Sequence, residues 1–401
     1  MGKNIRFFFL FFIIFEVLAG YSCGSEYSSN LNHLIDNQTS VIIADECGRI
    51  VYGKNALQKM IPASIIKILT SLTAFYYLGS SYRFKTDFYF NKKTCDLTIY
   101  GYGDPLFISE VIDDTAKEIS LKVNKINNII VDDSYFNYPI VISGQTKNTI
   151  QPYDAPAGAV CANFNTVWFK TDKNGMLVSS EKQTPLLDFV KRKVKSSGLE
   201  HGRIPLSFNQ SRVYAGHLLK FFLSKYKVSV KGCVVLYDSK QDRGDILYTY
   251  ISKFSIKEVV SYLLCYSNNF IANQLFLASG AKYLKYPATL IKAQKAAKNY
   301  YKNIIKIDNL KIYEGSGLSV KNRINALEFL KILKEFYPHK KLMKHNNGEY
   351  FKTGTLKSVR TRAGYIKSRN GKYYMYVVFV NSFNKNTDSI MRLVKRKILS
   401  F

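Results

Sequence analysis

The stretch PASIIKILTSLTAFYYLG, residues 62–79, decides the fold of this chain. Its apolar residues predict a buried helix that begins at Ser64 and ends before Gly79. Residues three apart share one face of a helix, so Ser64 and Lys67 should touch in its first turn. Burial among isoleucines disfavours the charged ammonium of Lys67, and the neutral amine can act as a base. The pattern therefore predicts a serine nucleophile beside a lysine base, while an ordinary lysine that reaches solvent remains the alternative.

Ser-x-x-Lys alone is a weak signal, because it also begins at Ser179, Ser224 and Ser382. A second short motif, Ser267-x-Asn269, lies between two segments predicted to be helical, 259–265 and 270–277. A tight loop at this point would direct both polar side chains into a cleft. The alternative is a polar turn with a capping serine.

A third motif, Lys352-Thr353-Gly354-Thr355, lies on a predicted strand, residues 350–355. Lys352 supplies positive charge, and the threonines supply hydroxyl groups and backbone amides. Gly354 allows a ligand to approach the backbone closely. This combination suits a substrate that ends in a carboxylate. A surface strand with a chance tripeptide is the alternative.

The remaining pattern indicates a mixed α and β chain. Hairpins are predicted for 41–44 with 49–52, and for 363–366 with 373–380 around Asn370-Gly371. Short strands dominate between about residues 82 and 238, and helical patterns interrupt them. Further helices are predicted at the following residues: 108–123, 213–226, 326–336 and 389–399. The last of these is expected to pack on the sheet rather than to lie on a membrane.

The three motifs, in this order, resemble those of the class C penicillin-binding proteins, the D-alanyl-D-alanine carboxypeptidase and endopeptidase family. The resemblance runs from about residue 40 to about residue 382 and includes the following segments: 103–105, 131–136, 155–165 and 313–319. Ser64 and Ser267 are 267 − 64 = 203 residues apart, a much longer gap than in class A β-lactamases. The chain departs from the family in the short segment 338–349 and in Arg360 and Arg362, which stand where the family has small or apolar residues. Both departures are expected to lie near the cleft.

The resemblance implies an α/β (α+β) fold of the serine β-lactamase and DD-peptidase type, a sheet with helices on both faces. Residues 23–84 and 247–401 would form a discontinuous catalytic domain, and residues 85–246 a largely β insert. The implied activity is D-Ala-D-Ala carboxypeptidase or endopeptidase action on peptidoglycan stem peptides, with β-lactams as covalent inhibitors and no metal or organic cofactor. A β-lactamase-like hydrolase and a non-catalytic wall-binding protein are the alternatives.

The resemblance also assigns roles to the motif residues. The catalytic residues would be Ser64, Lys67, Ser267, Asn269 and Lys352. The substrate-binding residues would be Thr353, Gly354 and Thr355. Thr353 and Lys352 would hold the terminal carboxylate of the substrate, and the backbone amides of Ser64 and Thr355 would hold the oxyanion.

The first residues predict a secretory signal peptide over residues 1–22. Lys3 and Arg6 precede an apolar run at 7–15, which is too short to span a bilayer, and small residues follow it. The mature protein is therefore expected to be exported to the periplasm or cell envelope. Cys23 stands where a lipid could be attached, and the other cysteines are expected to be scattered buried thiols.

The charge is strongly positive, with 58 Lys and Arg against 29 Asp and Glu and a net charge of +29. The basic residues are spread along the whole chain and form no recognisable nucleic-acid-binding module. For an exported protein this charge indicates a lysine-rich surface, or attraction to an anionic envelope or membrane surface. No nucleic-acid partner is predicted.

Overall fold

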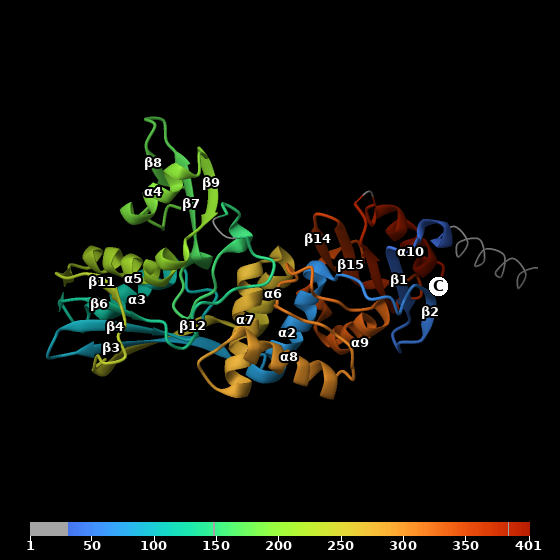
Figure 1. Cartoon of the computed structure of the whole chain (residues 1–401), viewed down its shortest axis with the longest axis horizontal. Coiled ribbons are helices and arrows are strands. Elements are labelled where there is room, and N and C mark those ends of the chain that lie inside the picture. The colour runs from blue at the N-terminus through green and yellow to red at the C-terminus, as the bar shows by residue number, and fades with distance from the viewer. Residues whose placement is uncertain (1–30, 147–148, 384) are drawn as a thin grey trace, which may run out of the picture. The chain divides into compact units, whose positions relative to one another are not determined.

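The computed structural model describes residues 31–146, 149–383 and 385–401 (Figure 1). The predicted leader and Cys23 lie outside the described residues. The chain divides into two compact units. The first contains the described residues up to Ile68 with 309–311 and 322–401; the second contains 69–308 and 312–321. The proposed domain division at residues 84 and 247 stays a prediction.

The first unit is built on a six-stranded sheet in which every neighbouring pair is antiparallel. In spatial order its strands are β13 (Lys344–Asn346), β14 (Glu349–Leu356), β15 (Val359–Lys367), β16 (Tyr373–Val380), β1 (Thr39–Ala44) and β2 (Ile50–Lys54). Both predicted hairpins are present, as β1 with β2 and β15 with β16. The strand from the start of the described chain therefore pairs with the strand close to its end, Thr39 opposite Val380.

Helices cover both faces of this sheet, as the resemblance implies. Helix α10 (Asp388–Leu399) packs on one face, where Val394 shares a core with Val378 of β16. Helix α9 (Ala326–Phe336) lies on the other face, where the rings of Phe329 and Phe379 meet edge to face at 6.1 Å. Because successive side chains of a strand alternate between faces, β16 is buried along nearly its whole length. The prediction that the last helix packs on the sheet is confirmed.

The second unit contains a five-stranded mixed sheet and two smaller sheets. The large sheet has the order β11 (Val234–Leu236), β6 (Ile129–Asp132), β4 (Asp96–Gly101), β3 (Arg83–Asn91) and β12 (Asp245–Ser255). The smaller sheets are β8 (Leu177–Ser179), β7 (Thr166–Thr171) and β9 (His201–Pro205), and β10 (Ser229–Val230) with β5 (Lys125–Ile126). The helices of this unit are α2 (Lys67–Leu78) from Leu69 onward, α3 (Ser109–Ser120), α4 (Asp188–Ser196), α5 (Phe208–Lys225), α6 (Ile256–Tyr266), α7 (Asn269–Leu284) and α8 (Leu290–Asn303).

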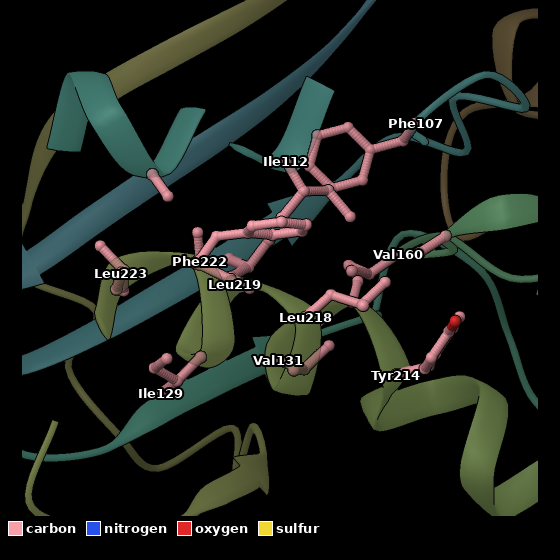
Figure 2. Close-up of a cluster of buried hydrophobic side chains, with 14 of the residues drawn as sticks. Phe107, Ile112, Ile129, Val131, Val160, Tyr214, Leu218, Leu219, Phe222 and Leu223 are labelled. Atoms are coloured by element: carbon pink, nitrogen blue, oxygen red, sulfur yellow. The ribbon is translucent and has the colours of Figure 1, made fainter. Parts of the chain in front are cut away.

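Helices α3 and α5 pack on one face of the large sheet and form its hydrophobic core (Figures 1 and 2). Ile112 of α3 and Leu219 of α5 meet Ile129 and Val131, which alternate along β6 and so point to the same face. All four side chains are at most 1% exposed. This core ties together segments that are separated by about a hundred residues of sequence.

Asp104, in the Gly-Asp-Pro segment after β4, is a buried acid within the second unit. Burial raises the pKa of its carboxyl to about 6, although the Leu106 amide donates to it at 2.9 Å and the Ser252 hydroxyl also opposes the shift. The folded state therefore holds a proton that the unfolded chain releases near its ordinary value of 3.8.

We expect Asp104→Asn to stabilise the protein at neutral pH. The wild type loses free energy of unfolding as the pH rises from about 4 through about 6, because its buried carboxyl must then ionise. The variant escapes this loss, which amounts to up to about 3 kcal/mol. Urea unfolding of both proteins at pH 4 and pH 7.5 measures it. A stability difference that is the same at both pH values would contradict the prediction.

The five described cysteines form no disulfide with one another. Cys161 is buried and its thiol donates to the Asp104 carbonyl at 3.1 Å. Cys47, Cys233 and Cys265 are exposed, so the prediction of buried thiols is wrong for these three. In the described part of the chain, no helix combines the length and apolar character that a membrane span requires.

Candidate active site

Ser64 and Lys67 meet at the start of the predicted helix. Residues 63–66 form a 3₁₀ turn, η1 (Ala63–Ile66), which continues as α2 (Lys67–Leu78). Side chains three apart eclipse each other in a 3₁₀ turn, so this geometry stacks Lys67 on Ser64. Lys67 Nζ donates to Ser64 Oγ at 2.8 Å. The predicted contact between the two side chains is confirmed.

The two side chains differ in their exposure. Lys67 is 0% exposed, whereas Ser64 is partly exposed. Ile65, Ile66 and Ile68 around them are also fully buried. An amine in such surroundings is easier to keep neutral than charged. The pair therefore presents a hydroxyl to its surroundings with an amine enclosed behind it.

The backbone just before Ser64 is unusual. Ala63 has φ of 47°, in the left-handed region that residues with a Cβ rarely adopt. Neighbouring contacts hold it there: the Thr361 hydroxyl donates to the Pro62 carbonyl at 2.8 Å, and the Asn381 side chain accepts from the Ile61 amide at 2.7 Å. Such strained positions gather at functional sites. This signal is invisible in the sequence, where Ala63 looks ordinary.

Gly354 of β14 lies directly against η1. A Cβ placed on it would stand 2.8 Å from the Ser64 amide nitrogen, 2.3 Å from Thr361 Oγ1 and 3.0 Å from the Ala63 Cβ. Only glycine permits so close an approach of the strand to the turn. The sequence assigned Gly354 a role in the approach of a ligand; the structure shows an additional role in the approach of η1.

We expect Gly354→Ala to displace η1 and to slow acylation of Ser64 much more than it lowers stability. Inserting a methyl group into such a contact costs about 1 to 3 kcal/mol of unfolding free energy. A matched control is Gly53→Ala, in the same sheet, where a Cβ would meet neighbours at ordinary distances of 3.7 Å or more. The labelling rate of each variant is measured by mixing it with a fluorescent penicillin and quenching the reaction at successive times. Equal rates for the two variants would contradict the prediction.

Lys352 is 3% exposed and lies on the same face of β14 as Gly354, two residues away. This is the face that carries η1. Lys352 Nζ donates to the carbonyl of Thr353 at 2.7 Å. Thr353 and Thr355 alternate with these residues and are exposed. The structure therefore brings Lys352 and Gly354 to the face that carries Ser64, and places the two threonine side chains on the outer part of the strand.

The edge of β14 is open beside these residues. Strand β13 pairs only with Glu349–Phe351. Within the described residues no strand pairs with 352–356 on that side, whereas β15 pairs with them on the other. An open edge of this kind offers backbone donors and acceptors to an extended peptide.

Arg360 and Arg362 lie on the opposite face of the sheet from η1. Arg362 stands across from Val378, on the face covered by α10, whereas Thr361 points to η1. Arg362 is engaged with Glu349 through two contacts of 2.8 Å. Arg360 donates to the carbonyls of Leu356 and Val359 in the turn after β14. The expectation that these arginines border the cleft is corrected by the period of the strand, which turns both away from Ser64.

Ser267 and Asn269 belong to the second unit and lie at the junction of α6 and α7. Ser267 ends α6 in the left-handed conformation, with φ of 56° and ψ of 34°. Asn268 caps α7 by accepting the Ile271 amide at 3.1 Å, and Asn269 is the first residue of that helix. The predicted tight loop between two helices is confirmed. Its strained residue is the motif serine itself, a second instance of strain at a motif.

Glu314 holds together the segment 313–319 in the second unit. Its carboxylate is fully buried and accepts the amides of Ser316 at 2.7 Å, Gly317 at 2.8 Å and Ser319 at 3.2 Å. The sequence shows only a glutamate within a segment that resembles the family. The structure shows that this carboxylate replaces the missing backbone partners of a buried loop.

The same segment joins the helices that follow two of the motifs. The Gly315 carbonyl accepts from Thr70 of α2 at 2.7 Å, and its amide donates to Asn273 of α7 at 3.0 Å. Thr70 comes one turn after Lys67, and Asn273 one turn after Asn269. Sequence reasoning did not single out Thr70 or Asn273, because each is an ordinary polar residue in a helix.

Comparison with known proteins identifies the family. The sequence model of the D-Ala-D-Ala carboxypeptidase 3 (S13) family matches residues 26–201 and 193–348. The D-alanyl-D-alanine carboxypeptidase DacB of Haemophilus influenzae is 23% identical over an alignment of 403 positions, which covers 84% of this chain and 83% of that protein.

Solved structures have the same fold. Penicillin-binding protein 4 of H. influenzae matches with a TM-score of 0.75 and 19% identity, over 92% of this chain and 98% of that one. A predatory peptidoglycan endopeptidase of Bdellovibrio bacteriovorus matches with a TM-score of 0.52 and 17% identity, over 90% of each chain. The chain described here belongs to the D-Ala-D-Ala carboxypeptidase 3 (S13) family.

Proposed function

We propose that this protein is a serine hydrolase that cleaves D-Ala-D-Ala bonds, or D-alanyl cross-links, in peptidoglycan stem peptides through an acyl-enzyme on Ser64. The observation that carries the proposal is the 2.8 Å contact between Ser64 Oγ and the Nζ of the fully buried Lys67. Membership of the S13 family supports the substrate class.

In the proposed acylation step, neutral Lys67 takes the proton of Ser64 as Oγ attacks the carbonyl carbon of the scissile bond. The bond to the leaving D-alanine nitrogen then breaks, and Ser267 with Lys352 relays a proton to that nitrogen. The amides of Ser64 and Thr355 would stabilise the developing oxyanion, and such a donor typically contributes about 3 kcal/mol. Water then releases the acyl group.

Substrate binding would use the open edge of β14. An extended peptide that pairs with residues 352–356 would bring its terminal carboxylate to Lys352 and Thr353. Asn269 would hydrogen-bond the acyl side of the substrate. These roles follow the family resemblance residue by residue, and the placement of Lys352 on the face that carries Ser64 supports one of them.

The structural relatives support the same substrates and inhibitors. The H. influenzae protein has been solved in complex with a β-lactam, and a predatory endopeptidase of B. bacteriovorus has been solved acylated by penicillin G. We therefore propose that β-lactams acylate this protein too. With the predicted leader, this function places it in the cell envelope, where its charge of +29 would attract it to anionic polymers.

Two measurements on the purified mature protein test the proposal. Fluorescent penicillin should label it covalently, and tryptic digestion should place the label on the peptide 60–67, which contains Ser64. Peptides that end in D-Ala-D-Ala should release D-alanine, and cross-linked muropeptides should be cut. Rapid turnover of the penicillin would favour a β-lactamase instead. A folded protein that is never labelled would leave a non-catalytic wall-binding protein as the better account.

A further inference from the structure

A pocket opens beside the Ser267 loop, within the second unit. Its volume is about 420 Å³, and Asn268, the middle residue of the Ser-x-Asn motif, is part of its lining. The rest of the lining comes from α6, the first turn of α7, the end of β12, the 3₁₀ turn η3 (Asn163–Asn165), the start of α3 with the residues just before it, and the β8–β9 region. This volume is in the range of pockets that hold small ligands.

One wall of this pocket is an aromatic platform on α6. The rings of Tyr262 and Tyr266, one helical turn apart, stack with centroids 6.2 Å apart and planes 17° apart. Phe254 meets Tyr262 edge to face at 5.8 Å. Tyr262 is 41% exposed and Tyr266 76% exposed, so broad aromatic surface remains open to solvent. Aromatic rings that are apolar on their faces and polar at one end suit ligands with mixed surfaces.

The other wall carries a fixed ion pair. Arg203 Nη2 donates to Glu181 Oε1 at 2.9 Å. The guanidinium also lies over the rings of Trp168 at 5.1 Å and Phe164 at 5.8 Å. Stacking and the ion pair together hold donors and an acceptor in one orientation. The wall therefore offers directed hydrogen bonds without a large net charge.

The charge of the pocket excludes an anionic ligand class. Its lining contains no lysine, in a protein whose Lys and Arg outnumber its Asp and Glu by 58 to 29. Its charged residues are one arginine, Arg203, and two carboxylates, Glu110 and Glu181. A neutral ligand with apolar faces and polar edges fits these walls. Pyranose rings have this character: their C–H faces pack on aromatic rings, and their hydroxyl and acetamide groups bind polar side chains.

We propose that this pocket binds an N-acetylated sugar of the peptidoglycan glycan strand. The inference rests on the proposed function, because the stem peptides that would react at Ser64 are attached to such sugars. A glycan subsite beside the Ser-x-Asn loop would favour polymeric or sugar-linked substrate over free peptide.

The single tryptophan of the chain reports on this pocket directly. Trp168 is stacked on Arg203, so occupation of the pocket should change its emission. We expect a trimer of N-acetylglucosamine to give a saturable change in Trp168 emission, both in the wild type and in Ser64→Ala. Cellotriose, which lacks acetamide groups, should give a much weaker one.

Variants distinguish the pocket from other surfaces. Tyr262→Ala should weaken binding of the trimer by about tenfold, since an aromatic contact of this kind contributes on the order of a factor of ten. It should lower kcat/KM for a disaccharide pentapeptide relative to that for the free pentapeptide. Tyr283→Ala, an exposed tyrosine outside this pocket, is the matched control and should leave the binding constant unchanged.

Each outcome bears on a different claim. A change that does not saturate, or that Tyr262→Ala leaves intact, would overturn the sugar subsite while penicillin labelling of Ser64 could still stand. A response to a diamino peptide but not to the trimer would also overturn it, and would assign the carboxylates to an ammonium group. Loss of penicillin labelling with intact sugar binding would instead overturn the proposed catalytic function alone.

Discussion

Replacing Ser64 with alanine should abolish covalent labelling by penicillin and lower D-alanine release by at least about 10⁴-fold. Ser64 Oγ is the only atom of the proposed mechanism that forms a bond to the substrate, so no neighbour can substitute for it. Ser64 is partly exposed and contributes one small hydroxyl, so the free energy of unfolding should change by less than about 1 kcal/mol. Gel fluorescence, a D-alanine assay and urea unfolding measure the three quantities.

A second Ser-x-x-Lys sequence in the same chain provides the control. Ser179 ends strand β8, and Lys182 follows it in a loop. Residues 180–183 form a bend and a turn rather than a helical turn, and the Ser179 hydroxyl accepts from the Glu181 amide at 3.1 Å, so this copy lacks the geometry of the pair in η1. Ser179→Ala should therefore be labelled like the wild type. Residual labelling of Ser64→Ala at the wild-type rate would refute Ser64 as the nucleophile.

Helices α6, α7 and α9 formed close to the residues that the sequence predicted. Helix α9 occupies residues 326–336, as predicted, and α6 and α7 extend both predicted segments outward. The pattern 64–78 gave the right place for Ser64 but not the 3₁₀ turn that carries it. A 3₁₀ turn joins residues three apart by hydrogen bonds, whereas an α-helix joins residues four apart. Over four residues this difference hardly changes the spacing of apolar side chains, so the sequence pattern does not distinguish the two.

Sequence reasoning missed helices α4 and α8 and placed the start of α5 too late. Helix α8 buries Ala293, Ala296 and Ala297. These small side chains give a weak apolar signal in a segment that is otherwise rich in lysine. Helix α5 begins at Phe208, before the predicted residue 213, because Ser207 and Gln210 form a capping box. The capping signal was present in the sequence and would have corrected the boundary.

Some contacts at the site depend on pairing between strands that are distant in the sequence, and no local sequence pattern reveals them. The place of Gly354 against Ser64, and the orientation of Arg362 toward α10, both depend on which face of a six-stranded sheet each residue occupies. That face is fixed only when β14, β15 and β16 find their register. Motif residues could therefore be named from the sequence, whereas their supporting contacts could not.

Lys67→Met should lower the rate of acylation by about 10² to 10⁴, the range typical of a lost general base. Methionine fills similar space without an amine, so the fully buried site keeps its packing while Ser64 loses the group 2.8 Å from its hydroxyl. Stopped-flow acylation by a chromogenic cephalosporin measures the rate. Thermal unfolding of the same sample shows that the variant is folded.

Lys67→Arg separates the two roles that the lysine could have. Arginine keeps a positive charge beside Ser64 but does not lose its proton, so it cannot accept one from the hydroxyl. If Lys67 acts as the base, the arginine variant should be as slow as the methionine variant, and it should also be less stable because the larger cation must be enclosed in a site that is 0% exposed. If the arginine variant instead retained acylation near the wild-type rate, the lysine would act through its charge. The proton of Ser64 would then have to leave by another route, with Ser267 as the first candidate to replace.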